Sequence, residues 1–158
     1  MMRLFDLVLS VLAILANAVV YGTDFFCAIV QRPAMANVDD TVLTRTMGEV
    51  HRYGDRRMPV PGAIGVVTAL LSAVVAGIAG HPAAAISSGI ATLALVVWLV
   101  VYAKVSAPVN KQFTAAATEG TTPGNARALQ STWDGVINLR VALQAVALLA
   151  LCYTLIAA

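Results

Sequence analysis

Residues 83–103 read AAAISSGIATLALVVWLVVYA, a run of 21 residues without one charged side chain. About 20 apolar residues in an α-helix span the roughly 30 Å hydrocarbon core of a membrane. Three further runs have the same character, at about 7–30, 63–79 and 136–157. Backbone polar groups in lipid must bond to one another, so these runs are expected to be helices. The sequence therefore predicts an all-α fold, a four-helix transmembrane bundle that forms a single membrane domain over residues 1–158.

The composition agrees with a lipid environment. Apolar residues make up 59% of the chain and charged residues 11%, whereas a soluble domain carries about 25% charged residues. The net charge of +2 is too small to indicate nucleic-acid binding. Asp6 interrupts the apolar stretch that a cleaved signal peptide would need, so the first run is expected to be a membrane helix. The expected partner is the lipid bilayer, and a homo-oligomer is left open.

The connections between the runs differ in length. Gly80-His81-Pro82 predicts a tight turn between the second and third runs. The first connection, residues 31–58, is long and charged. Residues 38–53 within it are expected to form an interfacial helix on the cytoplasmic membrane surface, with Asn37 as the N-cap.

The two long connections carry most of the positive charge. The second of them, residues 106–132, is expected to be helical with a turn at residues 120–125. Eight of the ten Lys and Arg residues lie in or beside these connections: Arg32, Arg45, Arg52, Arg56, Arg57, Lys104, Lys111 and Arg127. The positive-inside rule then predicts a multi-pass protein of the cell membrane with both long loops cytoplasmic and both termini outside.

Polar residues recur at helical spacing inside the first and last runs. The first run has Asp6, Ser10, Asn17, Tyr21 and Asp24 on one stripe, and the last has Trp133, Ile137, Arg140 and Gln144 on one face. Ionisable groups at membrane depth are costly and are usually paired or functional. Asp24 and Arg140 have the same expected depth, so we expect them to pair. Such a pair either fixes the register of two helices or lines a ligand cavity.

His51 is a second candidate site residue. It follows Met47 by four residues and shares a helix face with it. The sequence leaves three roles open for this imidazole: a general base, a haem or metal ligand, or an ordinary interfacial side chain. No standard zinc spacing is present, so no metal site is assigned.

Several short motifs resemble those of the anthrone oxygenase-like membrane proteins. They are Tyr21-Gly22-Thr23-Asp24-Phe25-Phe26, Arg32-Pro33-Ala34-Met35, Pro108-Val109-Asn110, and Trp133 followed by Asn138-Leu139-Arg140. The likeness covers nearly the whole chain. The resemblance implies four spans with two long loops on one side. Some members of that family are linked to the oxidation of anthrones to anthraquinones, and most have no assigned function.

The resemblance and the chemistry together imply roles for particular residues. A base removes an acidic C–H proton, and the resulting carbanion reacts with O₂, which in principle requires no cofactor. Asp24 or His51 is the implied base, and Arg140 and Asn110 are implied to stabilise the oxyanion. The implied substrate-binding residues are Asn17, Tyr21, Trp98, Asn110, Trp133 and Asn138. The segment from His51 to Arg57 does not map onto this chemistry.

Two other functions remain open at this point. One is a cofactor-binding membrane protein in which His51 ligates haem or a metal. The other is a non-enzymatic accessory or scaffold protein, whose polar residues would pair tightly and leave no cavity. The resemblance instead favours a small oxygenase that acts on a lipophilic aromatic molecule.

Overall fold

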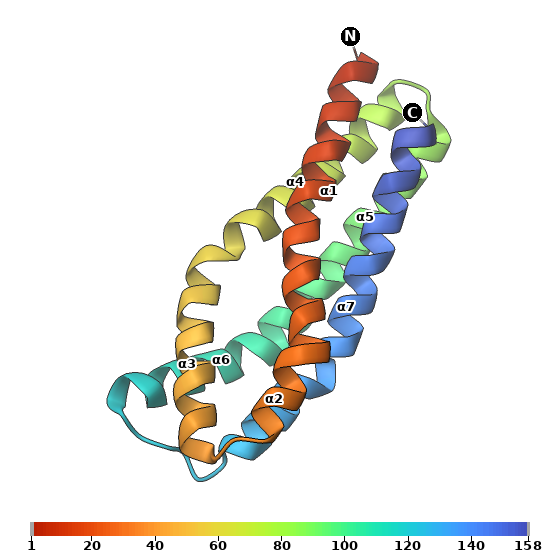
Figure 1. Ribbon diagram of the computed structural model, residues 1–158. Coiled ribbons are helices and arrows are strands. Elements are labelled where there is room, and N and C mark those ends of the chain that lie inside the picture. The colour runs from red at the N-terminus through yellow and green to blue at the C-terminus, as the bar shows by residue number, and fades with distance from the viewer. Residues whose placement is uncertain (1, 158) are drawn as a thin grey trace. The chain divides into compact units, whose positions relative to one another are not determined.

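The structure is a computed structural model that describes residues 2–157, with side chains from residue 4 onward. Its helices are α1 (Met2–Phe26), α2 (Arg32–Ala36), α3 (Asp40–Arg57), α4 (Pro59–Ile78), α5 (Pro82–Val101), α6 (Ala107–Glu119) and α7 (Ala126–Ala157), with π-helical segments η1 (Cys27–Gln31) and η2 (Tyr102–Ser106) (Figure 1). The described residues contain no strand, so the predicted all-α fold is confirmed. The expected location of the termini concerns residues 1 and 158, which lie outside the described residues.

Among the described residues, four helical stretches are long and apolar enough to cross a membrane. They are Leu4–Ala36, Pro59–Ile78, Pro82–Glu119 and Ala126–Ala157. The first and third stretches extend beyond the predicted apolar runs, which end at residues 30 and 103, because hydropathy marks the part of a helix that suits lipid and not the point where the helix ends. The third stretch continues through η2 and α6, and the turn at residues 120–125 is all that separates it from α7. Gly120 ends α6 with a φ of +68°, a left-handed conformation that favours glycine.

The first connection contains the predicted helix, but its N-cap was predicted wrongly. Oδ1 of Asp39 accepts a hydrogen bond from the N–H of Val42 at 2.8 Å, so Asp39 and not Asn37 caps α3. A carboxylate at this position also suits the positive end of the helix dipole. Asn37 instead follows α2, where its Nδ2 donates to the carbonyl of Pro33 at 2.8 Å. The predicted turn between α4 and α5 is confirmed, with Gly80 at a φ of +77°.

Each π-helical segment comes directly before a proline turn. Cys27–Gln31 is followed by Pro33, and Tyr102–Ser106 is followed by Pro108. Proline has no N–H, and its ring collides with the carbonyl four residues earlier in a regular helix. After each segment the next N–H bonds to the carbonyl five residues back, which widens the turn and lets the helix continue. A π-turn also changes which side chains share a face of the helix.

The packing divides the chain into two compact units. The first unit comprises Met1–Gly22, Val60–Leu99 and Ala142–Ala158, and the second comprises Thr23–Pro59 and Val100–Val141. The helices α1 and α7 each contribute residues to both units. The single membrane domain expected from the sequence stays a prediction.

The first unit has a core of small side chains with a buried hydroxyl network. Its apolar core consists of Ala13, Ala69, Ala91, Ala94, Leu95, Ala147 and Leu151. Small residues let helices approach closely where lipid removes the usual hydrophobic driving force. The hydroxyl of Ser72 donates to Oδ1 of Asp6 at 2.6 Å and lies 2.9 Å from the hydroxyl of Ser10. Asp6 and Ser10, two members of the polar stripe on α1, are therefore buried in the first unit.

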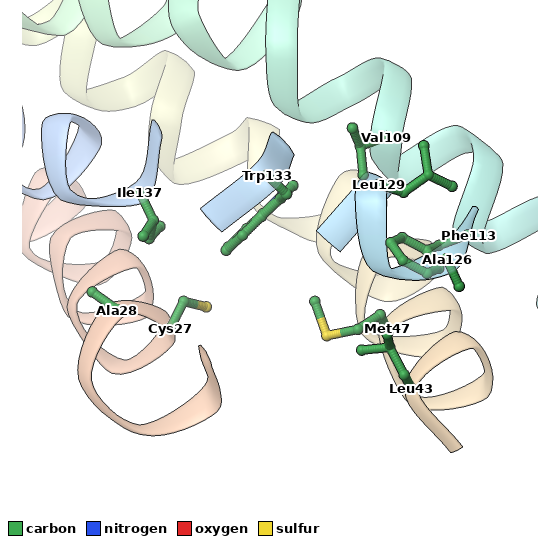
Figure 2. Packing of buried hydrophobic residues seen from close by; sticks show 10 residues of the cluster. All are labelled: Cys27, Ala28, Leu43, Met47, Val109, Phe113, Ala126, Leu129, Trp133 and Ile137. Carbon is green, nitrogen blue, oxygen red and sulfur yellow. The ribbon is translucent and has the colours of Figure 1, made fainter. Parts of the chain in front are cut away.

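The second unit has a larger core, in which α3 packs closely on α6. Its buried residues are Cys27, Ala28, Leu43, Met47, Val109, Phe113, Ala126, Leu129, Trp133 and Ile137 (Figure 2). The closest approach is at Gly48, where an added Cβ would lie 2.3 Å from Cβ of Ala117 and 2.5 Å from the carbonyl oxygen of Phe113. Only glycine fits there, and this contact fixes the buried face of α3 in the second unit.

Candidate active site

A buried ion pair lies within the second unit. Nη2 of Arg140 is 2.6 Å from Oδ1 of Asp24, and Nε donates to Oδ2 at 3.2 Å. Nη1 of Arg140 donates to the hydroxyl of Ser106 at 2.8 Å. Both charged side chains are buried, so the two-pronged geometry and the third hydrogen bond offset part of the cost of removing them from water. The predicted pairing of Asp24 with Arg140 is confirmed.

Two aromatic rings lie against the guanidinium of Arg140. Its central carbon is 5.4 Å from the ring centroid of Trp133 and 5.7 Å from that of Tyr102. Both distances are within the range of cation–π attraction. Nε1 of Trp133 donates to Oδ1 of Asn110 at 3.0 Å, which fixes the plane of the indole.

Asp55 joins the aromatic residues into one network. Its Oδ1 accepts hydrogen bonds from the hydroxyl of Tyr102 and from Nδ2 of Asn110, both at 2.8 Å. Asn110 in turn binds Trp133, whose ring contacts Arg140. We call this set the polar network: Asp24, Asp55, Tyr102, Ser106, Asn110, Trp133 and Arg140. It draws on α1, α3, η2, α6 and α7, all within the second unit.

His51 lies beside the polar network with one nitrogen unpaired. Its ring centroid is 5.6 Å from that of Trp133 and 6.1 Å from that of Phe113, and the side chain is only 5% exposed. Nε2 has no hydrogen-bond partner among the described residues. Burial lowers the pKa of His51 to about 4; Asp55 opposes this shift and Arg140 adds to it. The imidazole is therefore neutral at pH 7.

Two sulfur atoms adjoin this region and are bridged by an amide. The thiol of Cys27 donates to Oε1 of Gln31 at 2.8 Å, and Nε2 of Gln31 donates to Sδ of Met47 at 3.2 Å. Figure 2 shows Cys27, Met47 and Trp133 with their side chains directed toward the middle of the cluster. Within residues 2–157, no group of three or more His, Cys, Asp or Glu residues could hold a metal ion. The hypothesis that His51 ligates a metal therefore finds no group of partner ligands among these described residues.

The remaining predicted site residues lie elsewhere. Asn17 and Trp98 line a pocket of about 10 Å³ in the first unit, which is room for no more than one water molecule. Tyr21 is half-buried and belongs to the first unit. Asn138 is exposed and accepts a hydrogen bond from Nη1 of Arg32 at 3.5 Å. The structure thus brings together Asp24, His51, Asn110, Trp133 and Arg140 in the second unit.

Sequence reasoning assigned no site role to several residues of this region. Tyr102 and Ser106 contact Arg140, and Phe113 contacts His51. A signal was present, because Tyr102, Ser106 and Asn110 are spaced by four residues. The predicted third span ends at residue 103 and so excludes Ser106 and Asn110.

A comparison with protein-family models, with curated proteins and with solved structures found no match. The chemistry of the polar network and of His51 is therefore the basis on which a function can be proposed.

Proposed function

We propose that this protein is a membrane enzyme of the anthrone oxygenase-like kind, which oxidises a lipophilic aromatic molecule with O₂ and uses His51 as its base. The observation that carries the proposal is the unpaired Nε2 of His51, buried beside the rings of Trp133 and Phe113. A buried polar atom without a partner costs free energy, and a bound substrate that supplies a proton would offset that cost. The four apolar helices suit a protein whose substrate dissolves in lipid.

The surroundings of the two candidate bases favour His51 over Asp24. Both carboxylate oxygens of Asp24 accept hydrogen bonds from Arg140. Both oxygens of this carboxylate are therefore already engaged as hydrogen-bond acceptors. The imidazole of His51 is neutral at pH 7, since burial lowers its pKa to about 4. A pKa this low makes it a weak base in the free protein, and an anion formed beside it would raise its proton affinity.

The reaction begins with transfer of a proton from an activated C–H group of the substrate to Nε2 of His51. The electron pair stays on the substrate as a carbanion, which is delocalised onto a ring oxygen. The carbanion reduces O₂, a C–O bond forms, and the resulting peroxide takes up a proton. Loss of water then leaves a carbonyl group. In total one CH₂ group and one O₂ give one C=O group and one water, so the atoms and electrons balance.

The polar network acts mainly by holding the aromatic side chains. Arg140 is engaged by Asp24 and Ser106, and we assign it a positioning role toward Trp133 and Tyr102. Asn110 positions Trp133 through the indole N–H. A site built on fixed side chains keeps the reacting groups in register and reduces the entropy lost on binding.

The experiment is to add a hydroxylated anthrone to the purified protein in detergent and to record O₂ uptake together with quinone absorbance. We expect one quinone for each O₂ consumed, at a rate well above that of the same anthrone without protein. Quinone formation that is no faster with the protein than without it would contradict the proposal. A haem band in the absorption spectrum of the purified, active protein would instead point to the cofactor-binding alternative.

A further inference from the structure

The last turns of α3 gather positive charge around one exposed ring. The guanidinium carbons of Arg52 and Arg57 lie 5.0 and 5.1 Å from the ring centroid of Tyr53. Arg56 precedes Arg57 on the same end of the helix. Two like charges held on a single ring repel each other, so an anion bound beside them would lower the free energy of this arrangement.

Nearby acidic side chains neutralise only part of this charge. Arg52 forms an ion pair with Glu49 at 2.7 Å and donates from Nη2 to the hydroxyl of Tyr53 at 3.3 Å, and its buried Nε has no acceptor among the described residues. Asp55 is engaged by Tyr102 and Asn110 and forms no ion pair with either following arginine. Within the part of the chain that the structure describes, Arg56 and Arg57 form no ion pair at all.

The cluster lies at the start of a helix that is apolar enough to cross a membrane. Arg57 is two residues before Pro59, where α4 begins. Two residues reach at most about 7 Å, so these charges lie close to the end of the apolar segment. Phospholipid phosphates occupy the layer just outside the hydrocarbon, and Tyr is enriched at that depth. Tyr53 is 46% exposed, as expected for a side chain that meets this layer.

We propose that Arg52, Arg56 and Arg57, arranged around Tyr53, bind the phosphate of an anionic phospholipid headgroup. Guanidinium groups present N–H donors in a fork that matches phosphate oxygens, and basic residues near a membrane end of a helix attract anionic lipids. The site is separate from the proposed catalytic chemistry and does not depend on it.

The helix dipole offers a simpler explanation for part of the cluster. Arg56 and Arg57 lie in the last turn of α3, where positive charge is favourable whatever the solvent. The dipole does not account for two guanidinium groups on one ring. The two explanations also differ in a measurable way, because only lipid binding makes the effect of these arginines depend on the lipid headgroup.

The experiment is a thermal unfolding titration of the purified full chain in neutral detergent. Three additives are compared: phosphatidylglycerol, phosphatidylcholine with the same acyl chains, and inorganic phosphate. We expect phosphatidylglycerol to raise Tm at the lowest concentration, since it carries both the anionic phosphate and the acyl chains. In R56Q/R57Q the midpoint of the phosphatidylglycerol titration should rise about thirtyfold, from the loss of two basic residues near the lipid.

Two further variants make the test specific. R56K/R57K keeps the charge and should titrate closer to the wild type than to R56Q/R57Q. Lys111→Gln removes an exposed cation from α6 and should leave the titration unchanged. The comparison uses the lipid-dependent change in Tm of each variant, so a lower starting Tm does not obscure it. An unchanged midpoint in R56Q/R57Q, an equal response to phosphatidylcholine, or an equal response to inorganic phosphate would each overturn the proposal.

Discussion

Asp24 and Arg140 are separated by 116 residues in the sequence and form a two-pronged, buried ion pair. The pair ties residue 24 of α1 to residue 140 of α7 within the second unit. Tyr102 and Trp133 pack on the same guanidinium, so the pair also sets the position of the aromatic side chains next to His51. This relationship makes the ion pair a determinant of both stability and site geometry.

Removing one partner of this pair should be strongly destabilising. We expect Asp24→Asn or Arg140→Met to lower the free energy of unfolding by about 3–5 kcal/mol, because each leaves a buried polar partner uncompensated. The double variant Asp24→Leu/Arg140→Met should recover most of that loss. Chemical denaturation in detergent measures both. Asp40→Asn is the control, since its ion pair with Arg127 is exposed and should contribute less than about 1 kcal/mol. Equal small losses at Asp24 and Asp40 would show that burial does not strengthen the pair.

Gly48 should tolerate no side chain. A Cβ there would overlap Ala117 and the backbone of Phe113, so Gly48→Ala should cost about 1–3 kcal/mol of stability. Gly54, in the same helix, has nothing within 4 Å of an added Cβ. Gly54→Ala should therefore stabilise the protein by roughly 0.5–1 kcal/mol, through its better helix propensity. If α3 and α6 meet this closely, thermal unfolding should show a loss of stability for Gly48→Ala and a gain for Gly54→Ala. A Gly48→Ala variant as stable as wild type would contradict that contact.

Acid should destabilise the protein through His51. The pKa of His51 is about 4 in the folded protein against the ordinary 6.5 of a solvated histidine, so the unfolded chain binds more protons between these two pH values. The contribution of neutral His51 to the free energy of unfolding is complete above pH 6.5. It is lost as the pH falls toward 4, by up to about 3 kcal/mol. Free energies of unfolding measured from pH 7 to pH 4 should fall less steeply in His51→Gln. Identical slopes would mean that His51 is not buried as a neutral imidazole.

The charge distribution predicts which side of the membrane each turn faces. In a Cys27→Ser/Cys152→Ser background, His81→Cys reports on the turn between α4 and α5, and Thr122→Cys on the turn between α6 and α7. An impermeant maleimide added to intact cells should label His81→Cys and leave Thr122→Cys unlabelled, because Lys and Arg concentrate on the cytoplasmic side. The reverse pattern would show that the arginines of the first connection are not topology signals.

Much of the helical framework could be predicted from hydropathy and turn residues. Four apolar runs predict four helices, and Gly80 and Gly120 mark turns that glycine alone makes easily. The ion pair could also be predicted, since Asp24 and Arg140 lie at equal depth in their runs. That the third run and the helical connection after it form one continuous stretch could not, because hydropathy falls after residue 103 while the helix continues.

The rest of the site depended on where the third helix ends and on contacts between separate connections. Tyr102, Ser106 and Asn110 are spaced by four residues, but the predicted third span ends at residue 103, before two of them. The contact of Asn110 with Asp55 joins two segments that the sequence shows only as separate connections. Asn138 illustrates the opposite error: it neighbours the buried face of α7 in sequence but is exposed.

The most direct test of the proposed function compares His51→Gln with His81→Gln, which alters the other histidine, in the turn between α4 and α5. Both purified variants are checked for a wild-type unfolding transition at pH 7, and the rate of O₂-dependent quinone formation from a hydroxylated anthrone is then recorded. Loss of a general base typically reduces the rate about 10²–10⁴-fold, and we expect a loss in this range for His51→Gln, with His81→Gln unchanged. A folded His51→Gln variant that turns over as fast as the wild type would contradict the assignment of His51 as the base.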